Sequence, residues 1–88
     1  MTIASDPFKD ALNSVKHGIS LAEAADIEWG EAISWQDERH DYGEVRMCAI
    51  AYIGVRLHDI VYVDRGDVRR FISLRKANLK EIKRYAEA

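Results

Sequence analysis

Several residue types that define large protein classes are scarce in this chain. Its 88 residues include one cysteine, Cys48, and one proline, Pro7. A single cysteine excludes an internal disulfide and a Cys-x-x-Cys metal site, and we expect Cys48 to be a small buried hydrophobe. Because 48% of the residues are hydrophobic, the composition is that of a folded globule. We expect one domain covering residues 1–88.

Segments that mark membranes, secretion or common enzyme classes are also missing. No apolar run approaches the ~20 residues needed to span a bilayer. Residues 1–6 lack the basic and apolar stretches of a secretion signal, so we expect a cytoplasmic protein without membrane contact. There is no glycine-rich phosphate loop and no Gly-x-Ser-x-Gly elbow. His17, His40 and His58 lie far apart in the sequence without metal-ligand spacing, and no metal or other cofactor is expected.

Positive charge is concentrated at one end. Residues 65–88 hold eight Lys and Arg against three acids, whereas residues 1–64 hold five against twelve. The formal net charge of −2 therefore hides a basic end on an acidic body. Phosphate-rich ligands respond to local potential, so function is sought first at the basic end. For the helical part of this end alone we prefer the plainer interpretation, a solvated basic helix.

The first 28 residues are expected to form two helices. Asp6 can cap the first, Pro7 suits its first position, and Gly18 can end it in the left-handed conformation. Its apolar stripe consists of Phe8, Ala11, Leu12 and Val15. Ser20 and Glu23 predict a capping box that opens a second helix, to about residue 28. The inner side of that second helix is expected to hold Leu21, Ala24, Ala25 and Glu28.

The rest of the chain is expected to be a strand meander followed by a helix. Residues 32–35, 45–53, 55–63 and 68–75 show strand patterns, with turns at Gly54 and Gly66. Asp59 is out of pattern, which indicates a bulge or a polar role. Asn78 and Glu81 repeat the capping pattern, and the final helix has an apolar side of Leu79, Ile82 and Ala86. This order predicts an α+β fold: an antiparallel sheet of three to four strands, two N-terminal helices and one C-terminal helix.

The strand of residues 68–75 is unusually rich in arginine. Strict alternation places Arg69, Ser73 and Arg75 on one side of it. Guanidinium groups are rarely buried alone, and their fork matches phosphate oxygens. If Lys16 and Arg65 converge on the same side, the result is a concave anion site. Ion pairs explain the same arginines equally well, with the partners Glu44, Asp64, Asp67 and Glu81.

An ordered set of short motifs resembles the BrnT toxin family. The set consists of Asp6-Pro7, Lys16-His17-Gly18-Ile19-Ser20, Glu23-Ala24-Ala25, Gly43-Glu44-Val45-Arg46, Val61-Tyr62-Val63-Asp64-Arg65-Gly66, Ile72-Ser73-Leu74-Arg75-Lys76-Ala77, Glu81 and Tyr85. It covers nearly the whole chain. The first strand of the family, usually aromatic or apolar, corresponds here to Ile3-Ala4-Ser5.

The resemblance implies a RelE-like fold and ribonuclease activity. It also implies a BrnA-type ribbon-helix-helix antitoxin as partner, in a 2:2 hetero-oligomer. The complex would repress its own operon, so this chain would meet operator DNA only through the antitoxin. The remaining partner is the RNA substrate.

Metal-independent RNA cleavage can use the substrate's own 2′-hydroxyl as nucleophile. The resemblance assigns activity mainly to Lys16, Arg65 and Arg75. Both arginines suit stabilisation of charge on the phosphate, while Lys16 can stabilise charge or transfer a proton. Glu81 or Tyr85 is the candidate for further proton transfer. The expected substrate contacts are His17, Arg69, Arg70, Ser73 and Lys76.

Two other function classes stay open at this point. One is a non-catalytic toxin of the same broad fold that inhibits a protein target such as DNA gyrase. The other is an interaction module whose basic tail binds an acidic partner. The nuclease interpretation depends on the cations gathering in one pocket. Cations scattered over opposite surfaces, or each held by its own carboxylate, would end the nuclease proposal.

Overall fold

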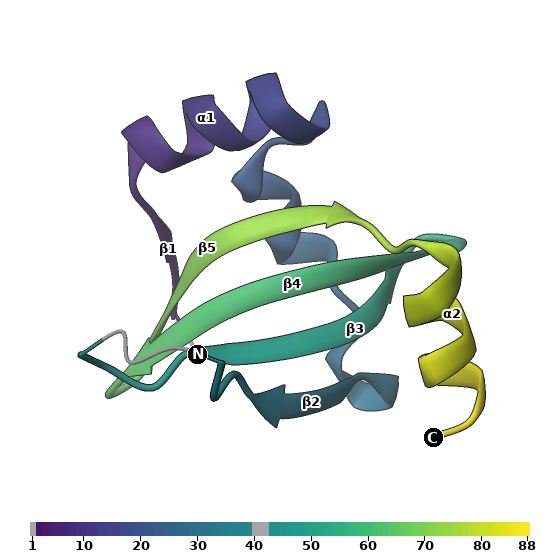
Figure 1. Ribbon diagram of the computed structural model, residues 1–88. Coiled ribbons are helices and arrows are strands. Elements are labelled where there is room, and N and C mark those ends of the chain that lie inside the picture. Colours follow the sequence, from purple (N-terminus) through teal and green to yellow (C-terminus); the bar gives the residue numbers. More distant parts are fainter. Residues whose placement is uncertain (1, 40–42) are drawn as a thin grey trace.

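The centre of the fold is a sheet built by five strands in the part of the chain that the structure describes (Figure 1). This computed structural model describes residues 2–39 and 43–88. The strand order is β1-β5-β4-β3-β2. The strands are β1 (Thr2–Ser5), β2 (Ile33–Gln36), β3 (Met47–Ile53), β4 (Arg56–Arg65) and β5 (Val68–Lys76). The helices are α1 (Pro7–His17), α2 (Leu79–Ala86) and two short 3₁₀ segments, η1 (Leu21–Asp26) and η2 (Trp29–Glu31).

The α+β class and the antiparallel meander from β2 to β5 are confirmed. The prediction of three to four strands was wrong because β1 adds a fifth, which pairs parallel with β5. Local signals behaved as expected at the turns. Gly54 and Gly66 have φ values of 61° and 59°, which a glycine adopts without steric penalty.

The second predicted helix is a 3₁₀ segment rather than an α-helix. Ser20 does cap it, accepting a hydrogen bond from the Ala22 N–H. With three residues per turn, the buried side is spaced by three, and Leu21 and Ala24 are fully buried. Ala25 and Glu28, expected on the inner side, are exposed instead.

Both α-helices turn their polar sides toward the sheet. On α1, Asn13 is buried. Its side-chain amide donates to the Leu74 carbonyl (2.8 Å) and accepts from the Leu74 N–H (3.1 Å), the two hydrogen bonds that a neighbouring strand would otherwise form with Leu74. Asp10 accepts from the Leu21 N–H at 2.7 Å and thereby fixes η1 to α1. The predicted apolar stripe of α1 consequently faces solvent, as does the predicted apolar side of α2: Phe8, Ala11, Leu12, Val15, Leu79, Ile82 and Ala86.

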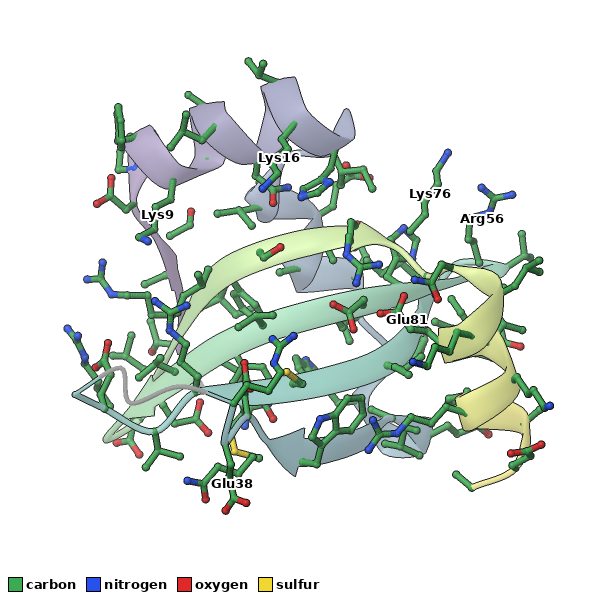
Figure 2. The ribbon with its side chains drawn as sticks, viewed as in Figure 1. Lys9, Lys16, Glu38, Arg56, Lys76 and Glu81 are labelled. Carbon is green, nitrogen blue, oxygen red and sulfur yellow. The ribbon has the colours of Figure 1, made fainter. Side chains whose placement is uncertain are left out.

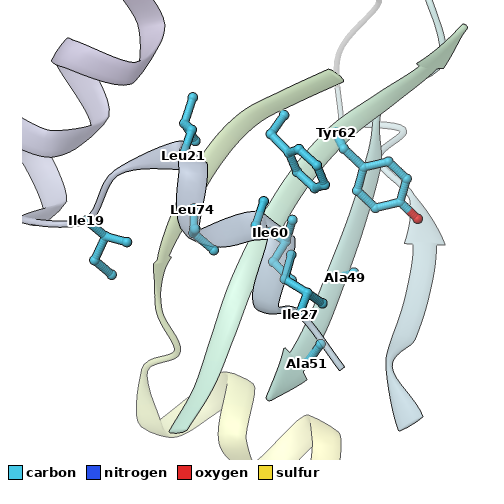
Figure 3. Packing of buried hydrophobic residues seen from close by; sticks show 10 residues of the cluster. Ile19, Leu21, Ile27, Ala49, Ala51, Ile60, Tyr62 and Leu74 are labelled. Carbon is cyan, nitrogen blue, oxygen red and sulfur yellow. The ribbon is translucent and has the colours of Figure 1, made fainter. Parts of the chain in front are cut away.

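The main hydrophobic core lies between one face of the sheet and η1 (Figure 3). Trp29 of η2 extends it, with its ring 5.5 Å from that of Tyr62 and 6.2 Å from that of Phe71. The buried residues of this core are Ile19, Leu21, Ala24, Ile27, Ala49, Ala51, Ile60, Tyr62, Phe71 and Leu74. Cys48 is buried as expected.

A β-bulge in β5 decides which side chains share a face. Tyr62 pairs with Phe71 and Val61 pairs with Ser73, so Ile72 is an extra residue without a partner. Phe71 and Leu74 therefore both reach the core, although they are three positions apart. Beyond Ile72 the alternation is reversed. The prediction that Arg69 and Arg75 share a face was wrong for this reason.

Candidate functional site

The cations expected in one pocket occupy separate places. Arg65 lies at the end of β4 and donates two hydrogen bonds to the same oxygen of Glu44, at 2.8 and 3.2 Å. Its pairing partner on β5 is Val68, whereas Arg75 lies seven residues further along that strand. At about 3.3 Å per residue, the two arginines are about 20 Å apart along the sheet. One phosphodiester cannot contact both.

Arg69 lies on the core face and is held by neighbouring side chains. Its guanidinium forms two hydrogen bonds with Asp64, at 2.7 and 2.9 Å. The guanidinium carbon lies 4.5 Å from the Trp29 ring centroid and 4.2 Å from that of Tyr62. The hydrogen bond from Arg69 lowers the pKa of Asp64, as expected for an ordinary ion pair. These contacts cover the edge of the aromatic core.

Arg75 lies on the opposite face, between two carboxylates. It donates to both oxygens of Glu81, at 2.8 and 2.7 Å, and its Nη2 lies 3.3 Å from Asp59. Glu81 is held in place by the α2 capping box, because it also accepts from the Asn78 N–H. Figure 2 shows Glu81 on the side of α2 that faces the strands. The predicted capping box thus fixes one of the predicted site residues.

The two carboxylates beside Arg75 have different proton affinities. Burial, with a smaller contribution from the neighbouring Glu81, raises the pKa of Asp59 to about 6 against the opposing charge of Arg75. For Glu81, burial acts in the same upward direction, but hydrogen bonds from Arg75 and Asn78 outweigh it and lower the pKa. Two adjacent carboxylates with separated pKa values are a common arrangement for acid and base chemistry.

An open groove of about 760 Å³ runs beside this cluster. Its cationic lining is Arg39, Arg75, Lys80 and Arg84, and its acidic lining is Asp37, Glu38, Asp59 and Glu81. The Arg84 guanidinium lies 3.6 Å from the centroid of the Trp35 ring, which also lines the groove. Arg39 is paired with Asp37 at 2.9 Å. The groove therefore combines cationic side chains, an indole ring and two carboxylates of different pKa.

The other predicted site residues are only partly gathered here. Burial and the charges of Lys16 and Arg75 together lower the pKa of His17, so these three lie within electrostatic reach of one another. Lys76 is exposed at the end of β5, where Figure 2 shows it extending away from the sheet. Ser73 and Arg70, both half-buried, lie further back on β5.

Tyr85 has a structural contact. Its hydroxyl donates to the Glu31 carbonyl at 2.9 Å, and its ring meets that of Tyr52 edge-on with centroids 5.6 Å apart. With Glu81 on Arg75 and Arg84 over Trp35, these contacts attach α2 to the sheet, although no residue of α2 is fully buried.

Among the described residues, no three His, Cys, Asp or Glu side chains cluster as a metal site would require. His58 is buried and its Nδ1 donates to the Arg56 carbonyl at 3.0 Å. His40 lies outside the described residues. No helix in this part of the chain is long and apolar enough to cross a membrane.

A comparison with known families bears on the function classes left open by the sequence. Residues 6–81 match the family described as "Ribonuclease toxin, BrnT, of type II toxin-antitoxin system". The chain belongs to the BrnT family. A comparison with curated proteins found no match. BrnT proteins are ribonuclease toxins with a protein antitoxin, and the resemblance found in the sequence is confirmed.

For this BrnT chain, sequence reasoning missed Asp59 as a site residue. The signal was present, because an acid in the interior of a strand, at an otherwise apolar position, needs a partner. The groove residues of the loop after β2, such as Asp37 and Arg39, gave no comparable signal. Charged residues in a polar loop are the ordinary case.

Proposed function

We propose that this chain is a RelE-like endoribonuclease toxin that acts in the cytoplasm and cleaves RNA in the groove beside Arg75. The single observation that carries the proposal is the cluster of Asp59, Arg75 and Glu81, in which one arginine joins two carboxylates of separated pKa. Family membership supplies the reaction class. The cluster supplies the groups that such a reaction needs.

The cleavage we propose is a transesterification that needs no metal. The 2′-oxygen of the substrate forms a bond to phosphorus while the bond from phosphorus to the 5′-oxygen breaks. Glu81, held ionised by Arg75, accepts the 2′-hydroxyl proton. Asp59 in its protonated form gives a proton to the departing 5′-oxygen. The products are a 2′,3′-cyclic phosphate and a free 5′-hydroxyl.

Arg75 has two roles in this mechanism. In the free protein it holds Glu81 in the charged form. In the transition state its guanidinium stabilises the charge that develops on the phosphate oxygens. Arg39, Lys80 and Arg84 line the same groove and bind the flanking phosphates, while Trp35 offers a surface for a base. Lys16 extends the cationic surface toward α1, beside His17, whose pKa is lowered by burial and by the neighbouring cations.

Arg65, Arg69 and Arg75 are apart and each is paired with a carboxylate, which is the condition stated above against the sequence hypothesis of one cationic pocket. The nuclease proposal therefore rests on family membership and on the cluster around Arg75. Arg65 and Arg69 are each paired with a carboxylate at positions remote from the groove, so the idea of one large cationic pocket is not retained. The smaller site at Arg75 replaces it. The mixed charge of the groove fits a substrate that is bound loosely and without strong sequence preference.

The test compares the two arginines of β5. Purified wild type, Arg75→Ala and Arg69→Ala are incubated with a defined single-stranded RNA in buffer containing EDTA. We expect Arg75→Ala to lose about 10²- to 10³-fold in kcat/KM, as for removal of an oxyanion-stabilising group. Arg69→Ala, assayed where it is folded, should stay within about threefold of wild type, because Arg69 lies on the other face of the sheet.

End-group analysis separates the possible outcomes. Products with 2′,3′-cyclic phosphate ends that form in EDTA support the mechanism. Intact RNA with wild-type protein, together with growth arrest on expression, would contradict it and favour a toxin that inhibits a protein target. Equal loss of activity in both arginine variants would show that the groove is not the site.

The partner follows from the family. A type II toxin requires a protein antitoxin, and we propose a BrnA-type ribbon-helix-helix protein in a 2:2 complex. Contact with operator DNA would then come through that antitoxin.

A further inference from the structure

The outer face of α1 carries a row of apolar side chains that nothing covers in the described part of the chain. Phe8, Leu12 and Val15 are 70%, 53% and 89% exposed, and Ala11 between them is exposed too. Their spacing of four and three residues puts them in one row along the helix. Contiguous exposed apolar surface often marks an interaction site, whereas single scattered apolar residues on a surface are ordinary.

The orientation of α1 is fixed by polar contacts on its inner side. Asn13 forms two hydrogen bonds with Leu74 of β5 and a third with the Ile19 carbonyl at 2.7 Å. Asp10 accepts from both the hydroxyl of Ser20 and the Leu21 N–H. Because a roll of the helix would break these buried hydrogen bonds, the apolar row cannot turn inward.

One border of the apolar row is basic. Lys9 and Lys16 are seven positions apart, so they lie one above the other on the same side of the helix, next to Leu12. Figure 2 shows both extending from the side of α1 that faces β5 in that view. The other border carries Ser14 and no charge. A complementary surface is therefore apolar in its centre and acidic along one edge.

We propose that this face, the α1 stripe of Phe8, Ala11, Leu12 and Val15 with its Lys9–Lys16 border, is the docking surface for an amphipathic helix of the antitoxin that carries acids along one edge. The inference rests on the proposed function because it takes the antitoxin as the partner. Helix-on-helix docking of this kind uses apolar residues at spacings of three and four, which the α1 stripe provides.

Charge disfavours one obvious alternative, a second copy of this chain packed antiparallel on the stripe. If two copies packed their α1 stripes antiparallel about a twofold axis, both pairs of lysines would lie along the same border of the interface. Four cations in one row would repel each other. A partner with acids along that edge would instead form favourable charge pairs with the same lysines, and the attraction would speed association.

The experiment measures binding of the purified product of the antitoxin gene in the same operon, by calorimetry and without RNA. We expect the double variant Leu12→Glu/Val15→Glu to bind at least about 100-fold more weakly than wild type, because it places two acids in the centre of the interface. Lys9→Glu should weaken binding about tenfold and reduce its salt dependence. The matched control Leu79→Glu, on the 84% exposed residue of α2, should bind within about threefold of wild type.

Several results would overturn the proposal. Wild-type affinity in the double variant, or equal loss in the Leu79→Glu control, would remove α1 as the docking surface. A free protein that is dimeric by light scattering, and monomeric as the double variant, would assign the stripe to a second copy. Binding to phosphatidylglycerol vesicles that the double variant abolishes would assign it to a membrane.

Failure of the proposed function is distinguishable from failure of this inference. Neither Leu12 nor Val15 belongs to the proposed catalytic groove, so the folded double variant should cleave RNA as wild type does. A chain that binds the antitoxin through α1 but never cleaves RNA would keep the docking surface and contradict the nuclease.

Discussion

Two arginines of one strand, Arg69 and Arg75, show how the same pair of hydrogen bonds can serve different ends. Each guanidinium donates two short bonds to one carboxylate, Asp64 or Glu81. Arg69 has one acidic partner and two aromatic rings, and its surroundings leave Asp64 an ordinary charged group. Arg75 has a second carboxylate, Asp59, that is buried and binds its proton near neutral pH.

The difference lies in what surrounds the pair rather than in the pair itself. An ion pair with a partly exposed carboxylate contributes little to stability. A buried second acid beside the pair creates a group whose protonation changes in the working pH range. The bulge at Ile72 makes both environments possible on one strand, because it reverses the alternation between Arg69 and Arg75.

The largest effect is expected from removing one of the two core side chains on either side of the bulge. Leu74 is fully buried and fixes the face of β5 that follows Ile72, the segment that carries Arg75. For Leu74→Ala we expect a loss of about 2–5 kcal/mol in the free energy of unfolding. Urea unfolding followed by circular dichroism measures it.

Deletion of Ile72 is the control, because it removes the extra residue and leaves Phe71 and Leu74 two positions apart, both still on the core face. A deletion variant as unstable as Leu74→Ala would show that the bulge itself is required.

The second test concerns the pH dependence of cleavage. Asp59 must be protonated to act as the acid, so kcat/KM should fall about tenfold per pH unit well above pH 6. In Asp59→Asn the rate should be lower, by about 10²-fold near pH 5, and that fall above pH 6 should disappear. Asp64→Asn is the matched control and should keep the wild-type profile. A falling limb that persists in Asp59→Asn would assign the acid to another group.

The smallest expected effects are on stability, and their signs differ between the two aspartates. The folded pKa of Asp59 is raised to about 6, so its contribution favours folding below about pH 4 and is lost as the pH rises through 6. The folded pKa of Asp64 is lowered, so its contribution is present above about pH 4 and is lost as the pH falls through its folded value.

Urea unfolding at pH 5 and pH 8 checks both signs. The free energy of unfolding of Asp59→Asn, taken relative to that of wild type, should be higher at pH 8 than at pH 5 by about 1–3 kcal/mol. Asp64→Asn should lose less than about 1 kcal/mol at pH 8, because the Asp64 side chain is 45% exposed. A change of the same sign and size in both variants would erase the distinction between the two sites.

Short-range features of the fold could be read from the sequence. Asp6, Asn78 and Ser20 cap the segments they were expected to cap, and Gly18 ends α1 with a φ of 71°. These features depend on a few neighbouring residues, so local chemistry determines them. The alternation in β3 likewise placed Ala49 and Ala51 in the core, although Cys48 and Ile50 on the other face are buried as well.

Features that depend on distant partners could not be read in this way. The bulge at Ile72 exists because Phe71 and Leu74 must both reach a core formed largely by other elements. The outward apolar side of α1 results from Asn13, whose partner Leu74 is 61 residues away. Hydrophobic periodicity predicts that the apolar stripe of a helix faces the core. The prediction fails where, as in α1, the polar side forms buried hydrogen bonds with the sheet.

The clamp between Asn13 and Leu74 has one more consequence, for how the sheet can grow. Strand β1 stops at Ser5, opposite Phe71, and beyond that point a lone carboxamide occupies the open edge of β5. Backbone groups that are already bonded offer no template to an incoming chain, so this margin is shielded from strand addition and from edge-to-edge aggregation. An added strand would have to join the outer side of β1 or of β2, at the two margins of the sheet.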